Sequence, residues 1–184
     1  MKRYGIALGL AVVMAGAGGA SAYAQDNDGC STSTLKGDYA FTVAGQILNP
    51  DGSITTRNGV AMTHFDGNGG LTQVDYVMSL TPASQMPGAP GGVDKNPAFR
   101  TGETGTYQVN QDCTGSAEID FPVPPGFATG ATIKLMFVLS NHGRAIHTVV
   151  TEVIPPGKTE AAAPVPAVIH SDGWKLGRAE GDQD

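Results

Sequence analysis

The chain has 184 residues, with 26 Gly and 12 Pro, only 15% charged residues, and a formal net charge of −6. This length fits one domain with a sizeable core. The acidic balance and the lack of a Lys/Arg cluster argue against nucleic acid and anionic membrane surfaces as partners, because both are bound through basic patches.

The first 24 residues have the three-part layout of a secretory signal peptide. Lys2 and Arg3 form the positive start, an apolar run follows, and Ala22-Tyr23-Ala24 is an A-x-A cleavage site. The apolar run is shorter than the roughly 20 residues that span a membrane. We expect cleavage after Ala24, a secreted or periplasmic protein of net charge −8, and no integral membrane segment after cleavage. An uncleaved anchor is the alternative.

The chain has two cysteines, Cys30 and Cys113, so a single disulfide pairing is available. An exported protein matures in an oxidising compartment, which favours the bridge over its alternative, two free buried thiols. Both cysteines stand in polar, turn-like sequence. We therefore predict a Cys30–Cys113 disulfide.

Three strands are expected next, over residues 37–48, 53–65 and 71–80, separated by turns rich in Asp, Asn and Gly. In the first strand Tyr39, Phe41 and Val43 share one face. In the third, an apolar face alternates with a polar one, as in a half-buried strand whose apolar face points inward. The apolar face holds Val74, Tyr76, Met78 and Leu80, and the polar face holds Gln73, Asp75 and Ser79.

The segment Thr81–Thr101 is rich in Pro and Gly and has no periodicity, which predicts a long loop. It is either a surface insertion or the rim of a binding site. A hairpin follows, with strands over residues 103–110 and 116–121 and Cys113 at its corner. Tyr107 and Val109 share a face of its first strand. In its second strand Ala117, Ile119 and Phe121 are expected to point inward, with Glu118 and Asp120 in solvent.

The segment Thr129–Ser140 is the most apolar part of the chain, with apolar residues on both faces. Such a strand is central, covered on both sides, or part of an assembly interface, so a homo-oligomer formed through it is one expectation. Residues 145–154 are expected to pair back with it. Residues 155–166 are rich in Pro and Ala and are typical of an extended linker. The tail after them either adds one last edge strand or docks through Trp174.

These elements predict an all-β fold, an antiparallel up-and-down barrel of about eight strands, with a β-sandwich as the alternative. The domain boundaries follow: a signal peptide over residues 1–24, the barrel over 25–154, and a linker and tail over 155–184.

No motif for catalysis, metal or cofactor binding is found. The chain lacks a G-x-S-x-G nucleophile elbow, its four histidines lie at no recognised metal-ligand spacing, and no Gly-rich strand-to-helix step occurs. We therefore assign no catalytic residue, no metal and no cofactor. Three polar side chains are candidates for a barrel interior, namely Tyr76, Tyr107 and His147. Arg57, Arg100 and Arg144 lie near turns and are expected in solvent.

Several short motifs resemble those of a group of uncharacterised exported bacterial β-proteins. The pattern is C-S at Cys30, L-x-G-x-Y-x-F at Leu35, F-D-G-x-G at Phe65, G-T-Y-x-V at Gly105 and D-C-T-G at Asp112. These motifs are structural in type, so the resemblance implies no activity. More loosely, the layout is similar to calycin-type barrels, which include lipocalin-like binders and allene-oxide-cyclase-like barrels. The lipocalin G-x-W is replaced here by Gly37-Asp38-Tyr39.

Three functions follow as hypotheses. The first is a barrel that binds a small hydrophobic or amphipathic ligand, since apolar strand faces converge on one interior. The second is a structural or protein-interaction module of the envelope, which would use Thr129–Ser140. The third and weakest is a cofactor-free cyclase or isomerase. On balance the sequence favours a protein that is not an enzyme.

Overall fold

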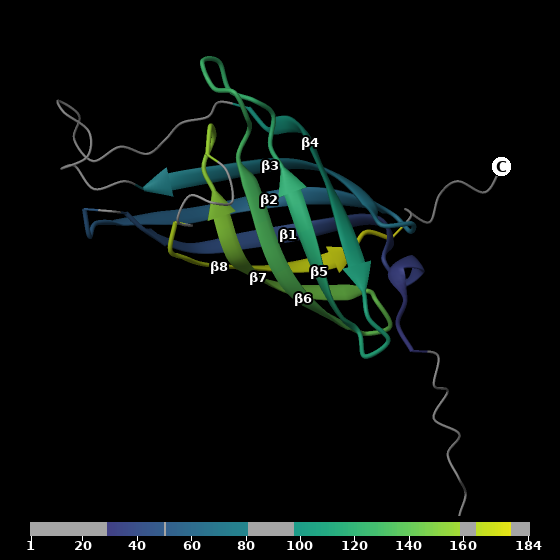
Figure 1. Cartoon of the computed structure of the whole chain (residues 1–184). Helices are drawn as coiled ribbons and strands as arrows, with labels where there is room; N and C mark the ends of the chain where they lie inside the picture. The colour runs from purple at the N-terminus through teal and green to yellow at the C-terminus, as the bar shows by residue number, and fades with distance from the viewer. Residues whose placement is uncertain (1–28, 50, 81–97, 159–164, 178–184) are drawn as a thin grey trace, which may run out of the picture.

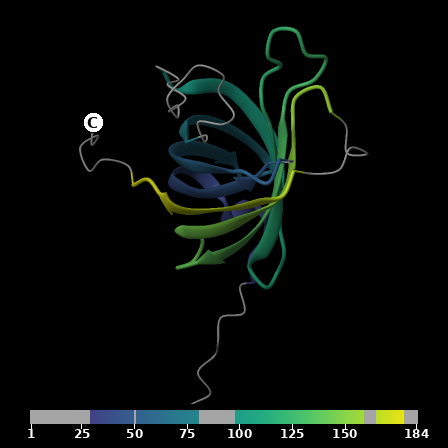
Figure 2. The same ribbon diagram turned by 90° about the vertical axis from the view of Figure 1, so that its left-hand side faces the viewer.

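The computed structural model describes residues 29–49, 51–80, 98–158 and 165–177, and in it eight strands form one closed antiparallel barrel (Figure 1). Each strand pairs with the next along the chain, and the last pairs with the first. Figure 2 shows the strands wrapped around a common interior. The predicted all-β, up-and-down barrel is therefore confirmed, and the alternative of a β-sandwich is wrong.

The strands follow one another in chain order around the barrel, preceded by a short 3₁₀ helix, η1 (Thr32–Thr34). They are β1 (Lys36–Leu48), β2 (Ile54–Asp66), β3 (Gly70–Leu80), β4 (Arg100–Val109), β5 (Thr114–Asp120), β6 (Thr132–Ser140), β7 (Ala145–Ile154) and β8 (Ala167–Lys175). Hairpin connections of this kind suit a barrel because each strand satisfies its backbone hydrogen bonds with its neighbours in sequence, and closure leaves no edge.

The eighth strand lies in the segment assigned to the tail by sequence, so the barrel extends past residue 154. β8 pairs with β1 from Ile47↔Ala167 to Tyr39↔Lys175, and with β7 on its other side. Gly173 makes this fit possible, since a Cβ there would lie 2.3 Å from the ring of Phe41. An inward aromatic ring over a glycine of the neighbouring strand is a recurrent way of packing a strongly curved sheet.

One end of the barrel is capped by η1 and the disulfide, and we call it the capped end. Tyr39, Phe65 and Tyr107 stack there edge to face, with ring centroids 5.3 and 5.0 Å apart. Leu35 is fully buried above them. The predicted Cys30–Cys113 disulfide is confirmed, with a Cα–Cα distance of 4.9 Å. The bridge ties the segment before β1 to the β4–β5 turn. The last residues of β3, β5 and β7 and the first residues of β4, β6 and β8 lie at the opposite end, the loop end.

β3 faces the other way from the expectation. Its polar residues Asp75 and Ser79 are buried, whereas Met78 and Leu80 are exposed. Apolar residues were expected inside because a half-buried strand usually hides its apolar face. Here Asp75 and Gln73 pair with the charged Arg100 and Glu103 of β4 inside the barrel, so the usual rule does not hold.

The long loop ends earlier than expected, because β4 already begins at Arg100. The part of the predicted loop over residues 81–97 lies outside the described residues. A β-bulge separates the pairs Gln73↔Glu103 and Asp75↔Arg100, and Gly102 within it has a φ of +84°. Arg100 and Glu103 are three positions apart, an odd step that puts side chains on opposite faces of a regular strand. The bulge turns both toward the interior.

Candidate functional site

A cavity of about 210 Å³ lies inside the barrel, toward the loop end. Its walls are mostly apolar side chains that the strands point inward at period two. The apolar lining comprises Phe41, Val43, Ile47, Ala61, Phe65, Leu71, Val77, Ala117, Ile119, Phe121, Ala131, Ile133, Leu135, Phe137, Ile146, Val150, Val153 and Ile169. A concave, mostly apolar space with few polar groups is the usual form of a small-molecule site.

The polar lining is concentrated on three adjacent strands. Arg57 and Thr63 come from β2, Gln73 and Asp75 from β3, and Arg100 from β4. Glu103 of β4 lies next to them and is 1% exposed. We call these six residues the charged wall. It brings two arginines and two carboxyl groups into a barrel whose other cavity-lining residues are uncharged.

Asp75 and Arg100 form a two-pronged ion pair. Arg100 Nε donates to Asp75 Oδ1 at 2.7 Å, and Nη2 donates to Oδ2 at 2.5 Å. The Arg100 guanidinium also lies 5.0 Å from the centre of the Phe121 ring. Asp75 is nearly inaccessible, whereas Arg100 is 39% exposed. Fork-on-fork pairing is the strongest arrangement for these two groups and fixes their relative geometry.

Glu103 is held by the same network. Thr63 Oγ1 donates to Gln73 Oε1 at 2.8 Å, and Gln73 Nε2 donates to Glu103 Oε2 at 3.0 Å. Glu103 Oε1 has no hydrogen-bond partner within the described part of the chain and lies 3.8 Å from Arg100 Nε.

The environment of Glu103 raises the pKa of its carboxyl group to about 7. Burial is the main cause, because it disfavours the charged form, and the nearby Asp75 carboxylate adds to the rise. The Gln73 hydrogen bond and the Arg100 charge act in the opposite direction. Glu103 therefore changes its charge near neutral pH.

A second polar pair lies on β7 and β8, four strands around the barrel from β3 and β4. The hydroxyls of Thr148 and Ser171 are 2.6 Å apart, and both residues line the cavity. A molecule in the cavity would therefore meet the charged wall on one side, a hydroxyl pair on the other, and apolar side chains between them.

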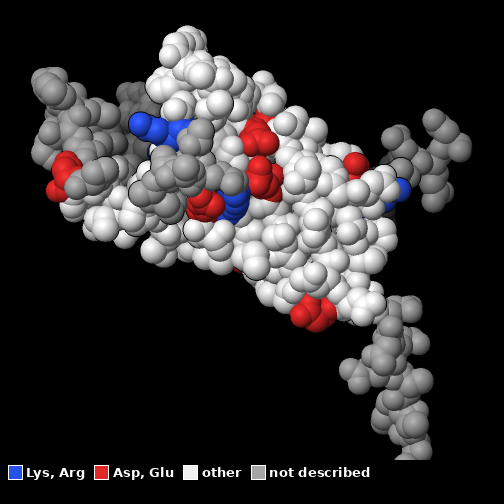
Figure 3. Space-filling model, in the orientation of Figure 1, with Lys and Arg blue, Asp and Glu red and all other residues white. Residues whose placement is uncertain are grey.

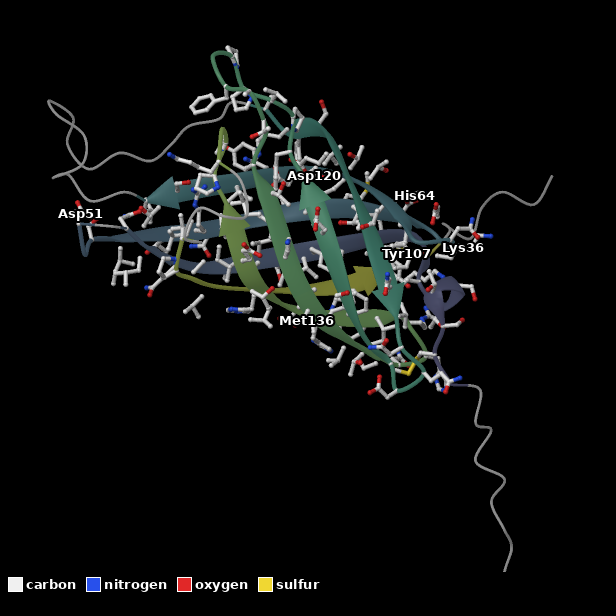
Figure 4. The ribbon with its side chains drawn as sticks, in the orientation of Figure 1. Lys36, Asp51, His64, Tyr107, Asp120 and Met136 are labelled. Atoms are coloured by element: carbon white, nitrogen blue, oxygen red, sulfur yellow. A yellow bond between two sulfur atoms is a disulfide. The ribbon has the colours of Figure 1, made fainter. Side chains whose placement is uncertain are left out.

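The three side chains predicted for the interior do not come together there. Tyr107 is buried at the capped end, where its hydroxyl donates to Leu35 O at 2.7 Å and accepts from Gly67 N at 3.0 Å (Figure 4). Tyr76 packs on Phe99, with ring centroids 5.8 Å apart, on the strand face that points away from the interior. None of the three lines the cavity. A cyclase or isomerase site would need other residues.

His147 lies on the outer face and belongs to a chain of hydrogen bonds across three strands. Its Nδ1 lies 2.7 Å from Asp172 Oδ1, and its Nε2 lies 3.2 Å from Ser140 Oγ. The order Ser–His–Asp is that of a hydrolase triad. However, His147 and Asp172 are 46% and 52% exposed, and the cavity lies on the other side of the sheet. We therefore interpret the three residues as a cross-strand surface network.

Sequence reasoning missed Arg57, Arg100 and Asp75, since it placed both arginines in solvent and Asp75 opposite the apolar face. The sequence shows that Gln73, Asp75 and Ser79 share one face of the strand, but alternation alone does not show which face points inward. Glu103 and Arg100 share a face through the bulge at Gly102, a residue that lies just outside the predicted strand over 103–110, so the alternation within that strand could not indicate it.

The doubly apolar segment behaves as expected on its inner face, where Ile133, Leu135 and Phe137 line the cavity. On its outer face Met136 and Val138 are 54% and 48% exposed, next to Val149 of β7 at 48% (Figure 4). In Figure 3 some acidic and basic side chains lie together near the middle of the view, others are scattered around them, and most of the surface between them is uncharged.

Within the described residues, no three His, Cys, Asp or Glu side chains are grouped so that they could hold a metal ion. The described segments also contain no helix with the length and hydropathy of a membrane span. The disulfide indicates an oxidising environment outside the cytoplasm. In comparisons with known proteins, no family model, no curated protein and no solved structure matches this chain.

Proposed function

We propose that this protein binds a small amphipathic molecule inside its barrel. The observation that supports the proposal is the cavity itself, which combines extended apolar walls with a compact charged wall. A core built only for stability has little use for four charged groups, because burying a charge is costly even when it is paired. Convergent polar groups in an apolar cavity are instead typical of a ligand site.

The size of the cavity limits the ligand. An engineered apolar cavity of about 150 Å³ is known to accommodate benzene. At about 210 Å³, this cavity suits a molecule of about ten non-hydrogen atoms, such as a substituted ring or a medium-length chain. A long lipid would not be enclosed.

Filling the cavity tests the proposal. Ala61 lines the cavity on β2, whereas Ala40 is exposed on the outer face of β1. We expect 1-octanol to bind the wild-type protein with a 1:1 stoichiometry in isothermal titration calorimetry. Ala61→Leu should weaken binding at least ten-fold, and Ala40→Leu should not. Equal binding by both variants, or no binding of any small amphiphile to the wild type, would overturn the proposal.

We further propose that the protein is exported and cleaved after Ala24, as its N-terminal sequence predicts. Residues 1–28 lie outside the described residues, and the disulfide supports the proposal because it requires an oxidising compartment. Intact mass of the protein recovered from the secreted or periplasmic fraction should match a chain that begins at Gln25. A full-length mass would contradict cleavage.

A second candidate function is a protein-interaction module, favoured by the exposed Met136, Val138 and Val149. These side chains lie on adjacent strands and form a small apolar patch that a second copy of the chain would cover. Light scattering after size exclusion should then show self-association that Met136→Lys abolishes. A monomer across a hundred-fold range of concentration would count against this function.

A further inference from the structure

The charged wall is electrically balanced in a way that restricts its ligand. With Asp75 and Glu103 both ionised, their two negative charges match Arg57 and Arg100, and the cavity is neutral. With Glu103 protonated, the same wall carries one positive charge. We propose that the cavity binds a small apolar carboxylic acid as its anion, and that Glu103 takes up one proton from solvent as the ligand enters; this inference rests on the binding function proposed above.

The hydrogen-bonding groups of the wall favour a ligand that accepts rather than donates. The two guanidinium groups carry N–H donors and no acceptor, and Arg100 directs two of its N–H groups at Asp75. Both oxygens of Asp75 accept from Arg100, whereas Glu103 Oε1 has no hydrogen-bond partner within the described residues, so a protonated Glu103 can donate to a ligand from this oxygen. A carboxylate supplies acceptors in the planar geometry that arginine fits best.

The uptake of a proton by Glu103 is expected because the cavity has low polarity. An anion added to a neutral wall would leave an uncompensated charge in an apolar cavity, which is costly. Glu103 is placed to remove this charge, because it is buried against Asp75 and Arg100 and its pKa already lies near neutrality. The arginines remain charged at any relevant pH.

The charged and titratable groups around Glu103 come from β2, β3 and its own strand. On β3 it faces Gln73 and Asp75, on its own strand Arg100, and Arg57 of β2 completes the charged groups at the cavity. The cavity-lining residues of β1 and β5 to β8 in the described part of the chain are uncharged. Tyr39 and Tyr107 lie at the capped end, and burial raises the pKa of each phenol.

A cationic ligand is disfavoured by the same balance. The wall would have to gain a negative charge, but both of its carboxyl groups are already ionised in the neutral state and its two guanidinium groups cannot lose their protons. An ammonium ligand of the same shape as the acid should therefore bind far more weakly.

The experiment compares octanoate, octanamide and octylammonium by isothermal titration calorimetry at pH 6 and pH 8. Octanoate and octylammonium keep their charges over this range. If the anion binds only when Glu103 is protonated, its apparent affinity should be about ten-fold weaker at pH 8 than at pH 6, since only a fraction of the protein is then competent. The affinity for octanamide should not change with pH, and octylammonium should bind weakest.

Proton uptake is measured directly in the wild type by repeating the octanoate titration at pH 8 in two buffers of different ionisation enthalpy. We expect close to one proton per ligand. Glu103→Gln should flatten the pH profile for octanoate, whereas Glu118→Gln on the outer face should keep it. The wild-type proton count needs no variant, so the test stands even if Glu103→Gln folds poorly.

The possible failures can be told apart. If octanamide binds but octanoate binds without proton uptake, or more weakly than octylammonium, this inference is wrong and the proposed binding function stands. If none of the three ligands binds and 1-octanol also fails to bind, the binding function itself is wrong, and the inference falls with it.

Discussion

Glu103 and Arg100 show how single residues are tuned by this barrel. Their inward placement depends on the bulge at Gly102, and the raised pKa of Glu103 depends on burial and on Asp75 across the strand pair. None of this could be predicted from alternation, because an odd spacing assigns the two side chains to opposite faces. The sequence did predict the apolar faces of β1 and β5 correctly, because in these two strands the apolar side chains are the ones that point into the barrel.

Replacing Arg100 should be strongly destabilising. Arg100→Leu removes the ion-pair partner of the buried Asp75, and breaking a buried pair in this way typically costs about 3 kcal/mol or more. Urea unfolding at pH 7 measures this loss. The matched control is Lys134→Met, which removes surface ion pairs with Glu118 and Glu152 and should cost less than about 1 kcal/mol. Equal losses would show that Asp75 is not effectively buried.

Glu103 should make the stability of the protein depend on pH between its unfolded and folded pKa values. Its pKa is about 7 in the folded protein against a reference of 4.5, so the folded state holds the proton more tightly. The stability that this group contributes is present below pH 4.5 and is lost as the pH rises to about 7. The full loss corresponds to about 3 kcal/mol.

The glutamine of Glu103→Gln cannot ionise, so this variant should not show the loss of stability that ionisation of Glu103 causes as the pH rises. The free energy of unfolding of the wild type, measured relative to Glu103→Gln, should therefore fall by about 3 kcal/mol between pH 4.5 and pH 8. Glu118→Gln, in which a partly exposed carboxyl on the outer face is replaced, should follow the wild type. Parallel curves for wild type and Glu103→Gln would contradict the assigned environment.

At the scale of elements, the capped end is where sequence motifs and structure agree best. Cys30 and Cys113 are joined as predicted, and the β4–β5 hairpin carries the second cysteine at its turn. Tyr107 points inward as predicted, but it does not line the cavity. Its hydroxyl instead forms hydrogen bonds with the backbone of Leu35 and Gly67 at the capped end. β3 was assigned the wrong face because the partners of its polar residues come from β2 and β4, which a strand-by-strand interpretation does not consider.

The two tyrosines give a matched test of this assignment. Tyr107→Phe removes the acceptor for Gly67 N and the donor to Leu35 O, and buried groups left unpaired cost about 1–3 kcal/mol. Tyr76→Phe on the outer side of β3 should change the free energy of unfolding by less than about 0.5 kcal/mol. If both variants lose the same stability, the hydroxyl of Tyr107 does not fasten the capped end.

The disulfide should be a large part of the total stability. It closes a loop with a sequence separation of 83 residues, for which the chain-entropy model gives roughly 4–5 kcal/mol. Unfolding of the Cys30→Ala/Cys113→Ala double variant in urea should show a loss of that order. A loss below about 2 kcal/mol would mean that the native contacts of η1 and the β4–β5 turn already restrain the chain without the bridge.

At the scale of the whole molecule, β8 decides the architecture. It pairs with both β7 and β1, and without it the sheet would have two open edges and no enclosed interior. The sequence predicted a barrel of about eight strands correctly. The boundary at residue 154 missed the closing strand, because a short strand of mixed polarity after a Pro/Ala-rich linker is difficult to distinguish from a tail.

The enclosed interior is the basis of the functional account, and its isoleucines report on it directly. Ile119, Ile133 and Ile169 line the cavity from three strands, whereas Ile54 at the loop end is 47% exposed. The decisive measurement is a titration with 1-octanol followed by the isoleucine δ1-methyl resonances in NMR. The account predicts that the three cavity methyls shift and saturate with one common dissociation constant while Ile54 stays unchanged. Shifts confined to Ile54 and other outer methyls, or unchanged cavity methyls, would contradict it.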